Sequence, residues 1–138
     1  MKFLLTCLFI LLISEAWAVP SLTSDANEDG FPDQWYELID GRVTTLKVDR
    51  DYDGRVDYLV KYSKMGKVTY EEYDYNFDGL MDDYYFYDDD RLIRQEIDTN
   101  FDEMVDVWVY LFEGIYIEKL EQDSDFDGQI DLVQEYGR

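Results

Sequence analysis

The apolar residues of this chain come in short runs that alternate with acidic loops and tight turns. Four runs follow Asp33, Asp57, Asp82 and Asp106, and the last of them reads Val-Trp-Val-Tyr-Leu-Phe. Aromatic and β-branched residues of this kind are typical of strands. After a turn, a second run leads back to the next acidic loop, at residues 42–48, 67–73, 91–97 and 116–122. With a final run at 132–136, the pattern predicts nine strands.

Short turns join the two runs of each pair. Asp40-Gly41 is the strongest hairpin signal among them, because both central residues of such a turn need a positive φ angle. The other turns lie at Met65-Gly66, Asp88 to Asp90 and Glu113-Gly114. The repeated unit is therefore loop, strand, turn, strand. The sequence predicts an all-β fold, an antiparallel meander built from hairpin repeats that acidic loops connect.

The returning runs predict a sheet with one wetter face. Their polar series is Lys47, Glu72, Glu96 and Glu121, and the more apolar series beside it includes Val48, Tyr73 and Ile97. Alternation of this kind places the two series on opposite faces. The outgoing run from Tyr84 to Tyr87 is aromatic on both faces. It predicts either a sheet that coils until these side chains are covered or an exposed aromatic strip.

The acidic loops share the frame Asp-x-(Asp/Asn)-x-Asp-Gly-x-x-Asp. They occupy residues 25–33, 49–57, 74–82, 98–106 and 123–131, so their starts are 24, 25, 24 and 25 residues apart. The fourth loop keeps every oxygen-bearing position but has Glu103 where the others have glycine. Five co-registered loops indicate a repeat array.

The spacing of the oxygen-bearing side chains suits calcium. This cation takes six to eight oxygen ligands, which a tight loop supplies from its positions 1, 3 and 5, with glycine at position 6. An EF-hand has Glu at position 12, but no loop here does, so the ninth-position Asp is expected to complete each site. The predicted ligands are Asp25, Asn27, Asp29, Asp33, Asp49, Asp51, Asp53, Asp57, Asp74, Asn76, Asp78, Asp82, Asp98, Asn100, Asp102, Asp106, Asp123, Asp125, Asp127 and Asp131.

Metal-free turns, magnesium and zinc are the alternatives to a calcium site in these loops. Asp, Asn and Gly are common in surface turns that bind no metal. Magnesium demands a nearly ideal octahedron and keeps its waters, which makes it a poorer fit than calcium. Zinc is poorer still, because the loops have neither Cys nor His ligands.

Composition narrows the range of functions. The chain has 33 acidic and 12 basic residues and no histidine, and its formal net charge of -21 would repel nucleic acid. The absence of histidine removes the usual general acid or base at neutral pH. Hydrophobic residues make up 46% of the chain, which favours a folded protein over a disordered one.

Residues 1–18 have the layout of a secretory signal peptide. An apolar run from Phe3 to Ile13 precedes the small-residue frame Ala16-Trp17-Ala18, and the run is too short for a stable membrane span. Cys7 leaves lipid attachment as an alternative. We expect a secreted or periplasmic protein in which residues 19–138 form a single repeat domain without cysteine.

The repeated unit resembles those of short repeat arrays in exported bacterial proteins. The likeness lies in the acidic frame, the aromatic strand after it, the Gly-Arg or Gly-Lys turn and the acidic return strand. The likeness covers about residues 25 to 138. The loops alone are similar to the calcium loops of integrin α-subunit propellers and thrombospondin type-3 repeats. The resemblance implies that positions 1, 3, 5 and 9 of each loop bind calcium, and Glu103 departs from it. A dockerin fits the loops but not the strands between them.

Three classes of function follow from these patterns. The first is a calcium-binding module in which the metal is structural and the sheet binds a protein or glycan partner. The second is a calcium-dependent glycan-binding protein or adhesin that uses aromatic residues such as Trp35, Tyr84, Phe86 and Trp108. Large aromatic side chains are mostly buried, which favours these residues as part of the core instead. The third is an enzyme, for which no nucleophile-base pair, phosphate loop or redox motif is present. We expect no catalytic activity.

Overall fold

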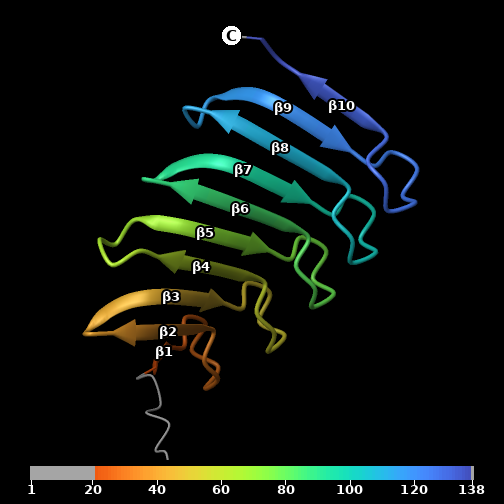
Figure 1. Cartoon of the computed structure of the whole chain (residues 1–138). Helices are drawn as coiled ribbons and strands as arrows, with labels where there is room; N and C mark the ends of the chain where they lie inside the picture. Colours follow the sequence, from red (N-terminus) through yellow and green to blue (C-terminus); the bar gives the residue numbers. More distant parts are fainter. Residues whose placement is uncertain (1–20, 138) are drawn as a thin grey trace, which may run out of the picture.

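The computed structural model describes residues 21–137. The predicted signal peptide lies outside these residues. The described chain forms ten strands in one antiparallel sheet, in which every strand pairs with its neighbours in sequence (Figure 1). They are β1 (Ser21–Ser24), β2 (Gln34–Ile39), β3 (Arg42–Val48), β4 (Tyr58–Tyr62), β5 (Val68–Tyr73), β6 (Asp83–Asp88), β7 (Arg91–Ile97), β8 (Val107–Phe112), β9 (Tyr116–Gln122) and β10 (Leu132–Glu135).

The all-β meander is confirmed, with one strand more than the nine predicted. The additional strand is β1, which pairs with β2 from Ser21 opposite Glu37 to Ser24 opposite Gln34. Its sequence Ser-Leu-Thr-Ser contains neither an aromatic nor a second large apolar residue. The sheet is open, and none of the described segments is a helix that could cross a membrane.

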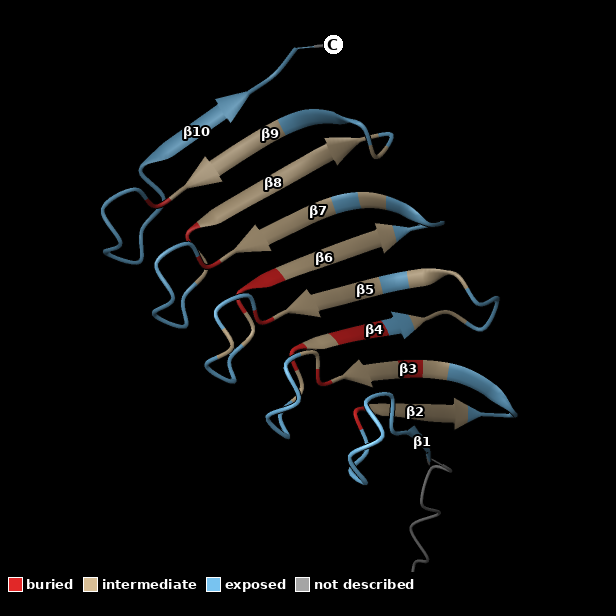
Figure 2. Cartoon of the chain, turned by 180° about the vertical axis from the view of Figure 1, so that it is seen from behind, coloured by how far each residue is buried: buried red, intermediate tan, exposed pale blue. Residues whose placement is uncertain are grey.

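A single layer of strands leaves little room for a central core. Leu59 and Val60 are the buried hydrophobic residues of the described chain, and most other strand residues are half-buried (Figure 2). Side chains on each face therefore cover one another across neighbouring strands. Burial is deepest where the loops leave the sheet, and the residues there are aspartates (Figure 2).

The strand register separates the two faces as the polar series predicts. One cross-strand row runs through Trp35, Lys47, Leu59, Glu72, Tyr84, Glu96, Trp108 and Glu121. We call the face that carries this row the charged face. The same face pairs basic side chains with rings: Arg94 Cζ lies 4.0 Å from the centroid of Phe86, and Lys119 Nζ lies 4.2 Å from that of Tyr110.

The opposite face is richer in tyrosine. Tyr58 and Tyr73 lie with their ring centroids 4.5 Å apart, and Tyr73 also contacts Tyr75 and Tyr85 at 5.4 and 5.6 Å. Tyr58 and Tyr73 lie on the same face of the sheet as Val60, which is 1% exposed. Trp35 and Trp108 on the charged face are half-buried, so both faces keep aromatic surface partly open to solvent.

The turns lie at the end of the sheet opposite the acidic loops (Figure 1). Asp40 and Gly41 have φ angles of 52° and 73°, as predicted for a two-residue hairpin turn. Asp89 and Asp90 take the same conformation without glycine, at 52° and 62°. Because all turns share one end, the five loops are brought together at the other.

Candidate metal loops

The five loops line one end of the sheet (Figure 1). Backbone hydrogen bonds fix where each loop begins and ends. In the second loop, Asp57 N donates to Val48 O at 2.9 Å, which closes the loop at its base. Asp74 N, at the start of the third loop, donates to Asp57 O at 2.9 Å. A bond that closes the base occurs at every loop. The first aspartate of each later loop also donates to the ninth aspartate of the loop before it, so these aspartates form a continuous series along this end.

The first aspartate of the second loop organises the bend. Asp49 Oδ1 accepts from Tyr52 N at 2.6 Å, and Asp49 Oδ2 accepts from Gly54 N at 2.7 Å. The ninth aspartate acts from the other side, because Asp57 Oδ2 accepts from Arg50 N at 2.5 Å. Buried backbone N–H groups need such partners. Asp49 and Asp57 are 3% and 2% exposed, and these contacts explain how an acidic side chain is tolerated at the base of the loop.

The third and fifth positions form successive turns around the mouth of the loop. Asp51 Oδ1 accepts from Asp53 N at 3.1 Å, and Asp53 Oδ1 accepts from Arg55 N at 2.8 Å. Aspartate commonly binds the backbone two residues ahead in this way. Both side chains stay exposed while the first and ninth are buried, so the loop is open toward solvent.

Three of the five loops bring carboxylates close enough to hold one metal ion. In the second loop, oxygens of Asp49, Asp51, Asp53 and Asp57 all lie within 4.8 Å of one another. The first and fifth loops gather three carboxylates each within the same distance: Asp25, Asp29 and Asp33, and Asp123, Asp125 and Asp131. Asp127 is outside the last group, although the sequence pattern predicts it as a ligand.

In the third and fourth loops, the asparagine at position 3 both accepts a hydrogen bond from the aspartate at position 5 and donates one to it, whereas a carboxylate could only accept. Asn76 Oδ1 accepts from Asp78 N at 2.9 Å, while its Nδ2 donates to Asp78 Oδ2 at 2.9 Å. Asn100 and Asp102 repeat both contacts. In the described chain these two loops form no group of three carboxylates as close as those of the second loop. Asn27 makes the same contacts in the first loop, which is nevertheless among the three.

In the second and fifth loops, the aspartate at position 3 has a raised pKa, to which neighbouring carboxylates contribute. Desolvation raises the pKa of Asp51, and the charges of Asp53, Asp57 and Asp49 raise it further. In the fifth loop the charge of Asp127 is the main cause of a raised pKa at Asp125. A cation placed among these groups would relieve their repulsion.

The fourth loop keeps the common shape despite Glu103. Its N–H donates to Asp98 Oδ2 at 2.8 Å, as Gly54 N does to Asp49. Glu103 has a φ angle of 74°, whereas the equivalent glycines have angles between 84° and 97°. Position 6 has a positive φ angle in all five loops, a conformation that glycine adopts without strain.

Position 4 of each loop is a second left-handed position, which the sequence pattern did not predict. Its residues are Glu28, Tyr52, Phe77, Phe101 and Phe126, with φ angles from 60° to 65°. These angles lie in the small left-handed region open to ordinary residues. The residue types gave no signal of it, because aromatic residues, which occupy this position in four loops, rarely adopt a positive φ angle.

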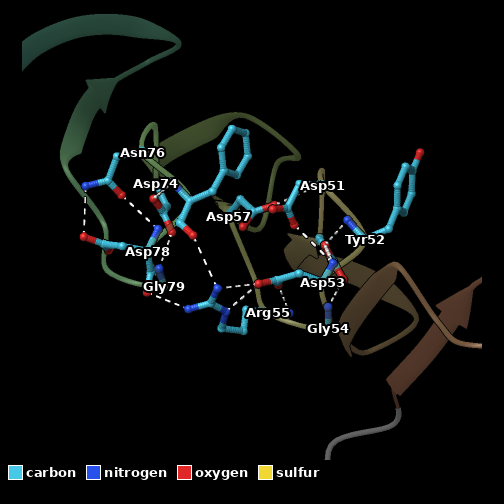
Figure 3. A network of polar contacts seen from close by, with 12 residues as sticks. Asp51, Tyr52, Asp53, Gly54, Arg55, Asp57, Asp74, Asn76, Asp78 and Gly79 are labelled. Carbon is cyan, nitrogen blue, oxygen red and sulfur yellow. Dashed lines mark hydrogen bonds and ion pairs between the residues drawn. The ribbon is translucent and has the colours of Figure 1, made fainter.

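Arg55 ties the second loop to the third (Figure 3). Its Nη1 donates to Asp78 O at 2.6 Å, and its Nε donates to Asp53 Oδ2 at 2.7 Å. The same contact with Arg55 lowers the pKa of Asp53. Arg50 makes a further cross-loop contact, with its Cζ 5.1 Å from the ring centroid of Phe77. The second and third loops are therefore packed against each other.

Comparison with known proteins gives no family. No family model and no curated protein matches the chain. Among solved structures, the crystal structure of accessory secretory protein 1, 2 and 3 in Streptococcus pneumoniae is similar over 80% of this chain, with a TM-score of 0.46 and 12% identity. The match covers 21% of the chain in that structure.

Proposed function

We propose that the chain is a secreted or periplasmic calcium-binding repeat protein, in which the metal is structural and the sheet binds a protein or glycan partner. The second loop carries the proposal, because four carboxylates from positions 1, 3, 5 and 9 converge there within 4.8 Å. Oxygen ligands arranged around a short loop are what calcium prefers. The proposal assigns no catalytic role to these carboxylates.

Calcium should stabilise the fold because it would bind the folded chain and not the unfolded chain. The unfolded chain can keep its carboxylates apart, whereas the native loops gather them. A ligand at ten times its Kd stabilises the folded state by about 1.4 kcal/mol for each independent site. Several sites together would approach the whole stability of an ordinary domain, about 5–15 kcal/mol.

The test compares thermal unfolding in calcium, in magnesium and in chelator. The melting temperature should rise with calcium concentration and fall sharply on chelation, with a smaller effect of magnesium. Calorimetric titration would count the sites. A melting curve that is the same in calcium and in chelator would mean that the loops are turns held by their own hydrogen bonds.

The variant Asp51→Asn separates metal binding from loop geometry. Asparagine already occupies this position in the first, third and fourth loops, where it makes the same backbone contact. Without calcium, Asp51→Asn should be at least as stable as the natural chain, because one repelling charge is gone. Its gain in melting temperature on adding calcium should be smaller. A larger calcium gain in the variant would contradict a role for Asp51 as a ligand.

A glycan is a second candidate partner for the sheet. Trp35 and Trp108 lie in one cross-strand row of the charged face and are only half-buried, so their rings remain partly accessible. Aromatic rings with one open side can stack on sugars. Glycan screening with and without chelator, followed by Trp108→Ala, tests this candidate. Binding that survives Trp108→Ala and Trp35→Ala together would place the partner elsewhere.

A further inference from the structure

The two edges of the described sheet are open, and both edge strands are short, with four residues each. β1 pairs only with β2, and β10 pairs only with β9. An unpaired edge exposes N–H and C=O groups, and natural proteins usually guard it with lysine, proline or a bulge. β1 has no charged residue in a chain that is 33% charged. β10 is exposed throughout and carries no guarding lysine or proline.

The two edge strands are the two halves of one repeat. In each internal hairpin, an outgoing strand follows a loop and a return strand precedes the next. β10 follows the fifth loop and is an outgoing strand, whereas β1 precedes the first loop and is a return strand. Within the described residues, β10 has no return strand and β1 has no outgoing strand. Among the described strands, each edge therefore offers the half of a repeat that the other lacks.

The register of the internal hairpins shows how these halves would meet. Val107, which follows the ninth aspartate of its loop, pairs with Gln122, which precedes the next loop. The same rule places Leu132 of one copy opposite Ser24 of another. Val133 then lies opposite Thr23, as Trp108 lies opposite Glu121 in β8 and β9.

The free backbone groups are in phase with this register. Ser24 O accepts from Asp33 N, so the backbone N–H and C=O of Ser24 point into the sheet. Those of the adjacent Thr23 therefore point toward the open edge. Tyr136 N donates to Glu118 O, so the backbone groups of Tyr136 point toward β9. Because this direction alternates along a strand, the N–H and C=O of Val133, three residues earlier, point toward the open edge. The outward groups of Thr23 and Val133 would therefore meet as a hydrogen-bonded pair.

The side chains on the two edges are compatible as well. Thr23 would face Val133, and Leu22 would face Gln134. The one charged residue of either strand is Glu135, which would lie opposite Ser21. No like charges are placed opposite each other, although the net charge of -21 repels copies at longer range. Salt screens that repulsion.

We propose that β10 of one copy pairs with β1 of a second copy, so that the sheet continues from chain to chain in the register of its own hairpins. The interface is head-to-tail, so it generates filaments when the rotation from copy to copy does not close a ring. The inference rests on the sheet edges and not on the proposed calcium sites. It names a second copy of this chain as the partner.

Sedimentation velocity and light scattering of the purified chain test the proposal over a wide range of concentrations at low and high salt. The natural chain should form oligomers that lengthen with concentration and with salt. Val133→Pro and Thr23→Pro each remove one outward N–H, and edge strands tolerate proline. Each variant alone should associate at least about tenfold more weakly, the cost of losing edge hydrogen bonds.

Mixing the two variants gives the decisive result. The Thr23→Pro copy keeps an intact β10, and the Val133→Pro copy keeps an intact β1. Together they should form one-to-one dimers that do not lengthen. A natural chain that stays monomeric would overturn the proposal, as would association that persists in either variant alone or a mixture that forms no dimer. Circular dichroism checks the fold, and Val133→Lys replaces Val133→Pro if the sheet is lost.

Discussion

Replacing Glu103 by glycine should strengthen the fourth loop. The structure places Glu103 at a φ angle of 74°, between the 60° to 65° of the side chains at position 4 and the 84° to 97° of the glycines at position 6. The loop therefore pulls position 6 beyond the region that ordinary residues tolerate, and the glutamate follows it only part of the way. Glycine would let the loop reach the angle of its neighbours.

The expected gain is small but measurable. A non-glycine residue held in the left-handed region costs about 1–2 kcal/mol. The substitution to glycine offsets part of this gain, because the greater freedom of glycine in the unfolded chain lowers the free energy of unfolding by about 0.4–1 kcal/mol. A net gain of about 0.5–1 kcal/mol would raise the melting temperature by about 2–5 °C. If the strain is released only when metal orders the loop, the same energy appears as about two- to fivefold tighter calcium binding.

Two companion variants separate backbone strain from charge. Glu103→Gln removes the charge but keeps the side chain, so it should leave the strain in place and give little gain. Gly54→Glu introduces the strain into the second loop, where a Cβ at Gly54 would have no atom within 4 Å and so no clash to complicate the result. Gly79 is unsuitable for this purpose, because a Cβ there would lie 2.8 Å from Arg55 Nη1.

Thermal melts with and without calcium, together with calcium titration by calorimetry or NMR, provide the measurement. We expect the fourth loop of the natural chain to bind calcium most weakly of the five. An unchanged or weaker fourth loop in Glu103→Gly would refute the reasoning, and so would an equal gain in Glu103→Gln, which would assign the effect to charge.

Three further predictions concern other parts of the chain. Arg55→Gln should tighten calcium binding at the second loop, because a cation that competes for Asp53 is removed; Arg55→Lys is the control that keeps the charge, and weaker binding in Arg55→Gln would contradict the prediction. Asp83 is buried, and desolvation raises its pKa despite hydrogen bonds from Gln95 and Tyr85, so the ionised form destabilises the fold once the pH exceeds the ordinary value of 3.8. Asp83→Asn should therefore raise the melting temperature at neutral pH, with a gain that disappears as the pH falls below 3.8; a gain independent of pH would point to another cause. N-terminal sequencing of exported material should begin at Val19, and a full-length product retained in the cell would contradict the predicted signal peptide.

The strands could be predicted from the sequence because each repeat has the same pattern. The alternation of Lys47, Glu72, Glu96 and Glu121 with apolar neighbours predicted the two faces, and the register confirms it. β1 was not predicted because Ser-Leu-Thr-Ser has no strand-forming signal of its own, and its conformation depends on pairing with β2.

The loops could be predicted in outline but not in detail. Glycine at position 6 indicated one left-handed residue, whereas position 4 is occupied by residues that rarely adopt that conformation, and only the loop as a whole imposes it. The hydrogen bond from Arg55 to Asp78 O depends on how closely successive loops stack. The spacing of the repeats along the sequence does not give this distance in space.

The exclusive pairing of consecutive strands has a consequence for how the chain folds. All contacts between strands join neighbours in sequence, so no long stretch of chain must be closed before any of them can form. Loop-closure entropy is therefore low, and chains with such local contacts fold fast. The free energy is approximately a sum of hairpin terms and neighbour interfaces, as in other linear repeats. Folding can then start at any hairpin and spread in both directions, and unfolding can begin by fraying from either end while the central hairpins remain formed.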